Sequence, residues 1–253
     1  MLRLEHLSCG YGPMRAVHEL DLEVGSGRIT ALLGANGAGK SSTIMCVAGH
    51  VDIHGGRILY EDVEINQLSP MQRVQAGIGL VPEGRRLFGS LTVRENLIVG
   101  GYCRTKEDEE PGIEQVVATF PRLGERIGQR AGSLSGGEQQ MLAMGRALMS
   151  KPKLLMVDEL SLGLMPKVID ICYAAIAALK DQGMSILLVE QSTQRALEVA
   201  DAVTVLESGK TVWKGTAAEA RDSTEMIDAC LGLLALPSLR SRATWARFTT
   251  WER

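Results

Sequence analysis

The chain has 253 residues, of which 45% are hydrophobic and 23% charged, and its formal net charge is −3. This composition is typical of a folded globular protein and excludes general disorder, and a chain of this length buries about 70% of the surface that its unfolded form exposes. The slight excess of acids also excludes a nucleic-acid role that rests on bulk positive charge.

Cysteine spacing and the length of apolar runs exclude further classes of protein. The five cysteines include no CxxC pair and are odd in number, so neither a zinc finger nor a disulfide framework is expected. No apolar run near the N-terminus has the form of a secretory signal, and none approaches the ~20 residues that span a membrane. We therefore expect a cytosolic chain that a partner carries to any membrane at which it works.

The first hundred residues predict short strands, glycine-rich turns and a few helices. An apolar run over 28–33 ends on glycine and is followed by a helical segment at 41–48. The stretch 106–112 is predicted to be a solvated loop, since four consecutive acids are followed by Pro-Gly. Further strands are expected at 2–7, 16–24, 57–60 and 77–81, and further helices at 70–75 and 93–99.

The second half of the chain alternates buried strands with helices. Helical periodicity begins near Glu114 and continues through 135–149. Such alternation is typical of a parallel sheet that helices cover on both faces, so the predicted fold class is α/β. Fully apolar strands are expected at 153–157 and 185–189, and helices at 167–180 and 192–200.

The composition changes again after Pro237. Three aromatic residues at three-residue spacing are interleaved with four arginines: Trp245, Phe248 and Trp251 among Arg240, Arg242, Arg247 and Arg253. Such spacing is compatible with an amphipathic stripe against a membrane or a partner, but a frayed extension is the favoured interpretation.

One segment carries the pattern of a phosphate-binding loop. Gly34-Ala35-Asn36-Gly37-Ala38-Gly39-Lys40-Ser41 fits G-x-x-x-x-G-K-[ST], and an apolar strand precedes it, as this motif requires. Its glycines allow backbone N–H groups to surround phosphate oxygens, and the helix that begins near Ser42 directs its N-terminus at the same anion. We expect Lys40 to contact the β- and γ-phosphates and Ser41 to bind Mg²⁺.

Two acids follow a buried strand further along the chain. Asp158 and Glu159 come directly after Leu154-Leu155-Met156-Val157. A strand of a parallel sheet that ends in carboxylates places them at the edge where ligands bind. There Asp158 can hold Mg²⁺ through water, and Glu159 can polarise an attacking water. Beside a phosphate loop, this otherwise common pattern indicates nucleotide hydrolysis.

A third motif decides the class. Leu134-Ser135-Gly136-Gly137-Glu138 opens a helix and offers a serine hydroxyl and glycine N–H groups to an anion, with no phosphate loop of its own beside it. In this order, the three motifs resemble those of ATP-binding cassette (ABC) ATPases, and the resemblance covers about residues 1–233. It implies that Ser135, Gly136, Gly137 and Glu138 reach the γ-phosphate that the other subunit of a dimer holds.

The resemblance also implies an architecture. We expect a P-loop cassette with a parallel sheet core, an antiparallel β-subdomain and a helical insert at about 85–150. A basic and aromatic tail at 234–253 would follow this single ATPase domain.

Further residues receive roles from the resemblance, some as departures from the family pattern. Tyr11 lies where the family stacks an aromatic ring on adenine. Glu83 replaces the usual glutamine of the loop that senses Mg²⁺ and the membrane subunit, and Gln191 replaces the switch histidine. Glu83 adds negative charge near the metal, and Gln191 cannot become cationic beside the γ-phosphate. We expect Lys40, Glu159 and Gln191 to be catalytic, and Ser41, Glu83 and Asp158 to bind the metal.

Two more departures follow Glu159. Leu160 stands where the family favours proline, and Ser161-Leu162-Gly163-Leu164 lacks the aspartate that many cassettes carry in this loop. Proline pushes the residue before it toward extended conformations, so we expect Glu159 to sample more backbone states here and Leu160→Pro to raise turnover. The alternative is that Leu160 packs into an adapted core.

Three short segments indicate which branch of this family the chain resembles. Val81-Pro82-Glu83-Gly84-Arg85-Arg86, Ser161–Leu164 and Val189-Glu190-Gln191 together resemble the LivF-type ATPases of branched-chain amino acid importers. The resemblance implies an ATPase that uses ATP and Mg²⁺ and sits peripherally on the cytoplasmic face of the membrane. Alternatives are the ATPase of a urea or amide importer, an exporter ATPase and a non-transport cassette ATPase.

The resemblance also implies partners. A second ATPase subunit, identical or different, would complete the dimer, and two membrane permease subunits would carry it. A periplasmic or extracellular substrate-binding protein would act through the complex, and no nucleic-acid partner is expected.

One pair of histidines remains outside these motifs. His50 and His54 have the i,i+4 spacing of metal ligands on a helix, but glycines flank them and no third ligand is evident. We expect a turn there.

Overall fold

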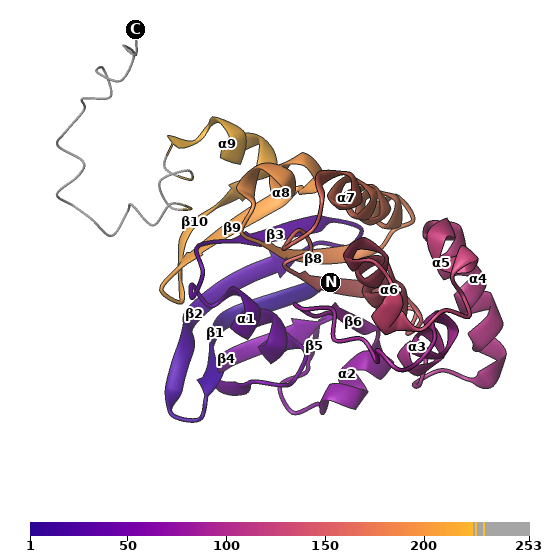
Figure 1. The fold of residues 1–253 in the computed structure, drawn as a ribbon. Helices are drawn as coiled ribbons and strands as arrows, with labels where there is room; N and C mark the ends of the chain where they lie inside the picture. Colours follow the sequence, from indigo (N-terminus) through magenta and orange to yellow (C-terminus); the bar gives the residue numbers. More distant parts are fainter. Residues whose placement is uncertain (225, 227–229, 231–253) are drawn as a thin grey trace, which may run out of the picture.

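The structure is a computed structural model that describes residues 1–224, 226 and 230. The chain forms two β-sheets, and helices pack on the larger one and beside the smaller one (Figure 1). The tail expected at 234–253 lies outside the described residues. Within the described part, none of the helices combines the length and apolar character that crossing a membrane requires.

The larger sheet has six strands in the order β10–β9–β3–β8–β7–β6. Among its described strands, only β10 runs antiparallel to its neighbour. Because parallel strands end at a common edge, the segments that follow β3, β7 and β8 meet there. The strands are β3 (Ile29–Leu33), β6 (Ile78–Val81), β7 (Leu154–Asp158), β8 (Ser185–Glu190), β9 (Ala202–Glu207) and β10 (Lys210–Thr216).

The smaller sheet is antiparallel, in the order β2–β1–β4–β5. Its strands are β1 (Leu2–Tyr11), β2 (Met14–Val24), β4 (Asp52–Tyr60) and β5 (Val63–Glu64). In β2, buried Leu20, Leu22 and Val24 alternate with exposed acids, which is the pattern of a sheet with one covered face. The predicted α/β class, with a parallel sheet and a separate antiparallel one, is confirmed.

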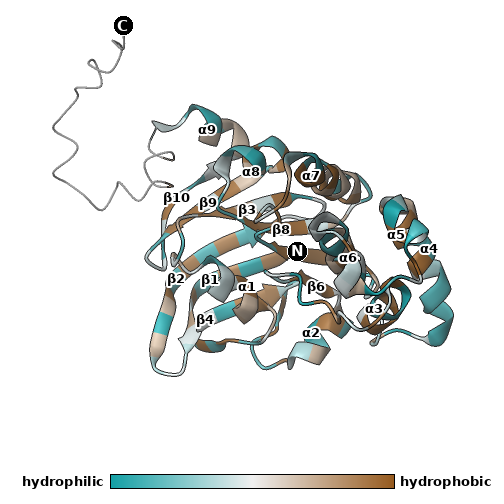
Figure 2. Cartoon of the chain, in the orientation of Figure 1, coloured by the Kyte–Doolittle hydropathy of each residue, from teal (hydrophilic) through white to brown (hydrophobic). Residues whose placement is uncertain are grey.

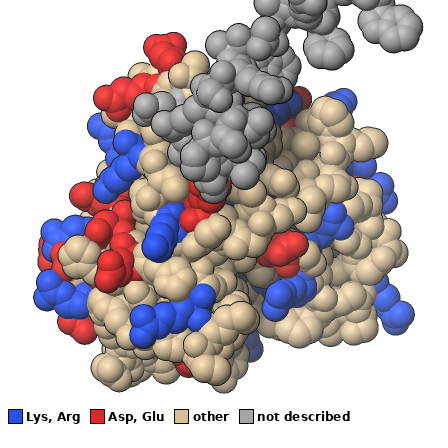
Figure 3. All heavy atoms as spheres, turned by 90° about the vertical axis from the view of Figure 1, so that its left-hand side faces the viewer, with Lys and Arg blue, Asp and Glu red and all other residues tan. Residues whose placement is uncertain are grey.

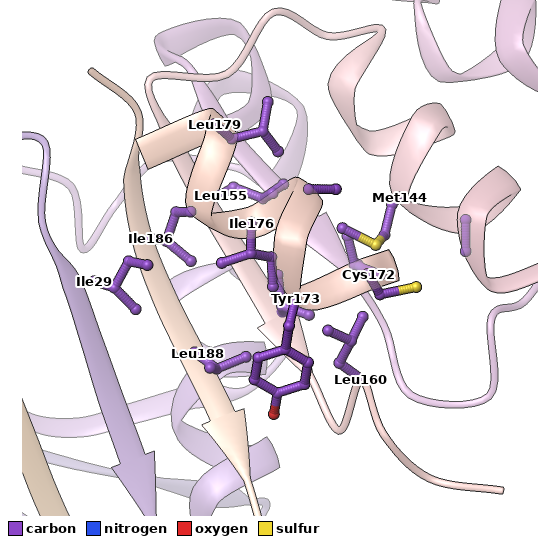
Figure 4. Packing of buried hydrophobic residues seen from close by; sticks show 14 of the residues in the cluster. Ile29, Met144, Leu155, Leu160, Cys172, Tyr173, Ile176, Leu179, Ile186 and Leu188 are labelled. Carbon is purple, nitrogen blue, oxygen red and sulfur yellow. The ribbon is translucent and has the colours of Figure 1, made fainter. Parts of the chain in front are cut away.

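Two hydrophobic cores lie on opposite faces of the larger sheet. Side chains alternate along β7, so Leu155 and Val157 enter one core and Leu154 and Met156 enter the other. Figure 2 shows the hydrophobic colouring of the central strands, and Figure 4 shows the first core beneath α7 (Pro166–Asp181). Each fully buried aliphatic side chain stabilises the fold by about 1.5–3 kcal/mol, and together these fix the strand ends that carry the site.

Helices α3 to α6 pack on one another at one side of the sheets (Figure 1). Capping boxes begin two of them, formed by Thr92 with Glu95 at α3 and by Ser135 with Glu138 at α6. The insert boundaries at about 85–150 stay a prediction. The other helices are α1 (Lys40–Val47), α2 (Pro70–Ala76), α3 (Val93–Gly100), α4 (Glu109–Thr119), α5 (Pro121–Glu125), α6 (Gly136–Leu148), α8 (Thr193–Val199) and α9 (Ala217–Asp222), with 3₁₀ turns at η1 (Lys106–Asp108) and η2 (Ala131–Ser133).

Two local expectations were wrong. The acidic stretch 106–112 is not a loop but forms η1 and the first turn of α4. Thr105 caps this start by donating to Asp108 at 3.0 Å, and carboxylates in a first turn are stabilised by the N-terminal end of the helix dipole. His54 lies on β4 rather than in a turn, and the described residues contain no group of three or more His, Cys, Asp or Glu side chains able to hold a metal.

Charged side chains of both signs share the molecular surface. On the face that Figure 3 presents, Lys and Arg lie beside Asp and Glu, which agrees with the near-neutral balance of the sequence.

Candidate nucleotide-binding site

The predicted phosphate loop connects β3 to α1, as the motif requires. The N-cap of α1 is Gly39, with a left-handed φ of 104°, and Thr43 N–H donates to the Gly39 carbonyl at 2.9 Å to close the first turn. Gly37 is left-handed as well, with φ of 79°. A chain of L-residues resists this backbone, so the glycines are what allows the loop to wrap a phosphate group.

The turn between β9 and β10 contacts this loop and helps to hold it in place. Gly209 N–H donates to the Ala38 carbonyl at 2.9 Å, and the Gly209 carbonyl accepts from His18 N–H at 2.8 Å. Gly209 has φ of 78°, and a Cβ atom there would lie 2.5 Å from the Ala16 carbonyl oxygen. The phosphate loop, β2 and the β9–β10 turn therefore meet at a junction that only glycine fits.

Lys40 joins the loop to the acid after β7. Its side chain is 4% exposed, and Nζ donates to the carbonyls of Gly34 at 2.9 Å and Ala35 at 3.1 Å. The same ammonium lies 3.7 Å from Glu159 Oε1. A buried ammonium requires such partners, and these place Lys40 and Glu159 at one point.

Ser41 and Asp158 form a second contact across the site. Ser41 Oγ donates to Asp158 Oδ1 at 3.1 Å. Burial raises the pKa of Asp158 to about 6, and the negative charges of Glu159 and Glu83 add to this, while the Ser41 hydrogen bond opposes it. A hydroxyl and a carboxylate oxygen are the hard donors that Mg²⁺ prefers, so the pair fits this ion. Glu83, in the exposed loop after β6, is close enough to influence Asp158.

Glu159 has an unusual backbone. Its φ is 48°, in the left-handed region, and its N–H donates to the Val189 carbonyl of β8 at 3.0 Å. Leu160, which follows it, is fully buried in the core beneath α7, where Figure 4 places it beside Cys172 and Tyr173. Leu160 therefore packs into the core, as the alternative proposed, and this burial argues against the expectation that Glu159 samples more backbone states.

Gln191 lines the same hollow as Glu159. It is exposed directly after β8, and a hollow of about 320 Å³ opens between the segments that follow β7 and β8. Its lining comprises Glu159, Ser161, Leu162, Gly163, Glu190, Gln191 and Ser192. Glu190 was missed from the sequence, although a carboxylate that ends an apolar strand is the same signal that identified Asp158.

The predicted signature segment stands at the start of α6. Ser135 and Gly136 are exposed, and Ser135 Oγ and N–H both donate to Glu138, at 2.8 Å and 2.9 Å. These hydrogen bonds lower the pKa of Glu138 and keep it charged. Among the described residues, no hydrogen bond or ion pair joins this segment to the phosphate loop of the same chain, and the exposure of Ser135 and Gly136 leaves the start of α6 accessible.

Arginines connect α6 to the loop that carries Glu83. Arg146 donates to the carbonyls of Arg86 at 2.7 Å and Arg85 at 3.1 Å. Arg85 in turn donates to Gln139 Oε1 at 3.1 Å, in the first turns of α6. The loop is thereby attached to α6 at two points.

Tyr11 ends β1 and pairs with Met14 across a tight hairpin. Its side chain is 51% exposed, so the ring is accessible for stacking. The structure thus brings Lys40, Ser41, Asp158 and Glu159 into contact, leaves Tyr11 and Gln191 accessible, and separates the signature segment from them.

Comparison with known proteins agrees with these motifs. The family model described as ABC transporter matches residues 17–161. The high-affinity branched-chain amino acid transport ATP-binding protein BraG of Pseudomonas aeruginosa is 46% identical over 232 residues, which is 92% of this chain and 100% of BraG. The probable branched-chain amino acid transport ATP-binding protein LivF of Archaeoglobus fulgidus is 37% identical over 235 residues, again 92% and 100% of the two chains.

A solved structure shares the fold. The ADP conformation of an ATP-binding cassette from an ABC transporter superimposes with a TM-score of 0.81 at 24% identity, covering 92% of this chain and 98% of that one. The matched family model spans more than half of the chain, and both named relatives align over their whole length. This chain therefore belongs to the ABC transporter family.

Proposed function

We propose that this chain is the ATP-hydrolysing subunit of an importer for branched-chain amino acids. The observation that carries the ATPase assignment is the meeting of the Lys40 ammonium, the Ser41–Asp158 pair and Glu159 at one edge of the sheet. The transported substrate class rests on the names of BraG and LivF, to which the chain is similar over 92% of its length.

Each residue of the site has a part in ATP binding or hydrolysis. Residues 34–42 surround the phosphates with backbone N–H groups, and Lys40 turns from its carbonyl partners to the β- and γ-phosphates. Tyr11 stacks on adenine. Ser41 and Asp158, with Glu83 nearby, would hold Mg²⁺, which would supply positive charge to the phosphate oxygens. Glu159 accepts a proton from the attacking water, and Gln191 donates a hydrogen bond toward the γ-phosphate without becoming charged.

A second cassette completes the site. The exposed Ser135 and Gly136, at the accessible start of α6, support docking against the γ-phosphate held by another subunit. The partner is an identical chain or a different cassette. Permease subunits anchor the dimer at the cytoplasmic face of the membrane, and a substrate-binding protein delivers the amino acid to them.

Transport in vesicles tests this proposal. The chain is purified with the membrane subunits and the substrate-binding protein that accompany it. The complex is reconstituted in vesicles with ATP inside and the binding protein outside, and uptake of labelled leucine and labelled urea is compared. We expect ATP-dependent leucine uptake that Lys40→Ala abolishes and that Lys153→Ala, at an exposed lysine paired with Glu61, retains. Uptake of urea alone would favour an amide importer, and the absence of any accompanying membrane subunit would favour a non-transport cassette.

A further inference from the structure

Glu190 is a buried carboxylate to which no catalytic role has been given above. It ends β8 and is 1% exposed. A carboxylate is seldom so deeply buried without a cation, because the desolvation of its charge is strongly unfavourable. Arg195, the next cation along the chain, pairs instead with Asp170 at 2.9 Å and Glu198 at 3.2 Å.

The partner of Glu190 is Ser161, two residues beyond Glu159. Ser161 N–H donates to Glu190 Oε1 at 3.1 Å, and Ser161 Oγ donates to Oε2 at 2.8 Å. Both carboxylate oxygens are thus bound by one residue. Burial raises the pKa of Glu190, and the hydrogen bonds from Ser161 oppose this rise. Two hydrogen bonds from one residue also fix the direction of the carboxyl group.

The Ser161–Glu190 hydrogen bonds add a second attachment between the segment that carries Glu159 and the end of β8. Glu159 N–H is already fixed to the Val189 carbonyl at 3.0 Å, on the residue before Glu190. Leu160 is anchored in the core. Residues 159, 160 and 161 are therefore each attached, the first and third of them to consecutive residues of β8. Gln191 follows Glu190 directly, so the same contact fixes the base of the Gln191 side chain.

We infer that Glu190 is a positioning residue for ATP hydrolysis: through Ser161 it holds the left-handed turn at Glu159 and the start of the Gln191 segment in one fixed relation. The inference rests on the proposed roles of Glu159 and Gln191. ATP binding depends on the phosphate loop, so loss of the pair affects turnover and leaves ATP affinity in place. Because misplacement of a catalytic group by about 1 Å lowers the rate by about 100-fold, we expect a 10- to 100-fold loss of kcat.

Substitutions of Ser161, with a matched control on the same strand, test the inference. Ser161→Ala removes the hydroxyl donor, and Ser161→Thr retains it. The control is Ser185→Ala: Ser185 is a buried serine at the start of β8 whose Oγ accepts from Gly27 N–H at 3.0 Å, away from the site. Steady-state ATP hydrolysis by the full chain, with its partner cassette added where that is a different chain, gives kcat and KM for each variant, and thermal unfolding reports stability.

The expected result separates positioning from stability. Ser161→Ala lowers kcat at least 10-fold, with KM for ATP within twofold of the parent, and Ser161→Thr recovers most of this kcat. Ser185→Ala lowers Tm by about as much as Ser161→Ala does but leaves kcat unchanged. Glu190→Gln should also lower kcat, since it replaces one acceptor oxygen with a donor. Unchanged kcat in Ser161→Ala, or an equal loss in Ser185→Ala, overturns the inference.

One further variant distinguishes failure of the inference from failure of the proposed function. Glu159→Gln should abolish hydrolysis if Glu159 accepts the proton of the attacking water. If Glu159→Gln hydrolyses ATP at the parental rate, the catalytic assignment itself fails. If Glu159→Gln is inactive but Ser161→Ala is not impaired, the catalytic assignment stands and the positioning role of Glu190 is wrong.

Discussion

Replacing Leu160 with proline, the residue that the family favours, should destabilise this chain. Leu160 is fully buried beneath α7, and Glu159 before it has φ of 48°. Proline requires the preceding residue to be extended, so the Glu159 backbone would have to leave its left-handed conformation or retain it under strain of about 1–3 kcal/mol. The ring also fills the Leu160 site incompletely, which costs about 1 kcal/mol for each missing methyl or methylene group. The sum is about 2–4 kcal/mol.

Thermal unfolding and ATP turnover check this prediction together. For a chain of this size each kcal/mol lowers Tm by about 2–4 °C, so Leu160→Pro should lower Tm by roughly 5–15 °C. Leu160→Ala calibrates the loss of packing, with about 3–5 kcal/mol expected for a fully buried leucine, and Leu162→Ala, at an exposed leucine in the same loop, should change Tm little. Turnover should fall with the altered Glu159 geometry. A Leu160→Pro chain with parental Tm and faster turnover would refute the reasoning and restore the expectation drawn from the sequence.

Four other perturbations probe the site. Lys40→Ala should weaken ATP binding by about 100-fold or more in calorimetry, and an affinity within twofold of the parent would contradict the assignment of the phosphate loop. Glu159→Gln should accumulate an ATP-dependent dimer, alone or with a partner cassette, in light scattering; a constant mass with both would argue against face-to-face closure. Gly209→Ala should lower Tm and ATP affinity more than Gly183→Ala, because both glycines are left-handed but only Gly209 has a carbonyl oxygen 2.5 Å from the added Cβ, and equal effects would exclude the bracing role. The pKa of Asp158 is raised from 3.8 to about 6 in the fold, so between these pH values the folded chain keeps a proton that the unfolded chain releases. The stabilisation of the fold by this proton is therefore complete below pH 3.8 and is lost as pH rises to about 6. Without metal or nucleotide, Asp158→Asn should therefore stabilise the chain above pH 6 by up to about 3 kcal/mol and have little effect near pH 4, and a pH-independent difference in denaturant titrations would count against this explanation.

The strands, the phosphate loop and the acids after β7 could be predicted because each depends on a local pattern. Apolar residues over 28–33 must be buried on both sides, and Asp158 and Glu159 must then stand at the strand edge. The start of α4 could not be recognised in the same way. Four adjacent acids are typical of a solvated loop, and only the cap from Thr105 shows that they begin a helix.

Contacts between residues far apart in the chain could not be predicted from the sequence. Gly209 braces Ala38 from the far end of the chain, and nothing in the turn after β9 indicates which loop it meets. The burial of Leu160 depends on α7, which packs over it in the folded chain. The same holds for Glu190, whose partner Ser161 is brought beside it by the pairing of β7 with β8.

Because the Glu83 loop is hydrogen-bonded to α6, a movement of the loop can be passed along that helix. Arg146 holds the loop near the C-terminal end of α6, and Arg85 reaches back from the loop to Gln139 near the other end. The helix has 13 residues, which at 1.5 Å per residue is about 20 Å. If α6 followed a tilt of about 10° in the loop as a rigid body, Ser135 would move by about 3.5 Å. The Glu83 loop near Asp158 and the segment proposed to face a second cassette are thus connected through α6.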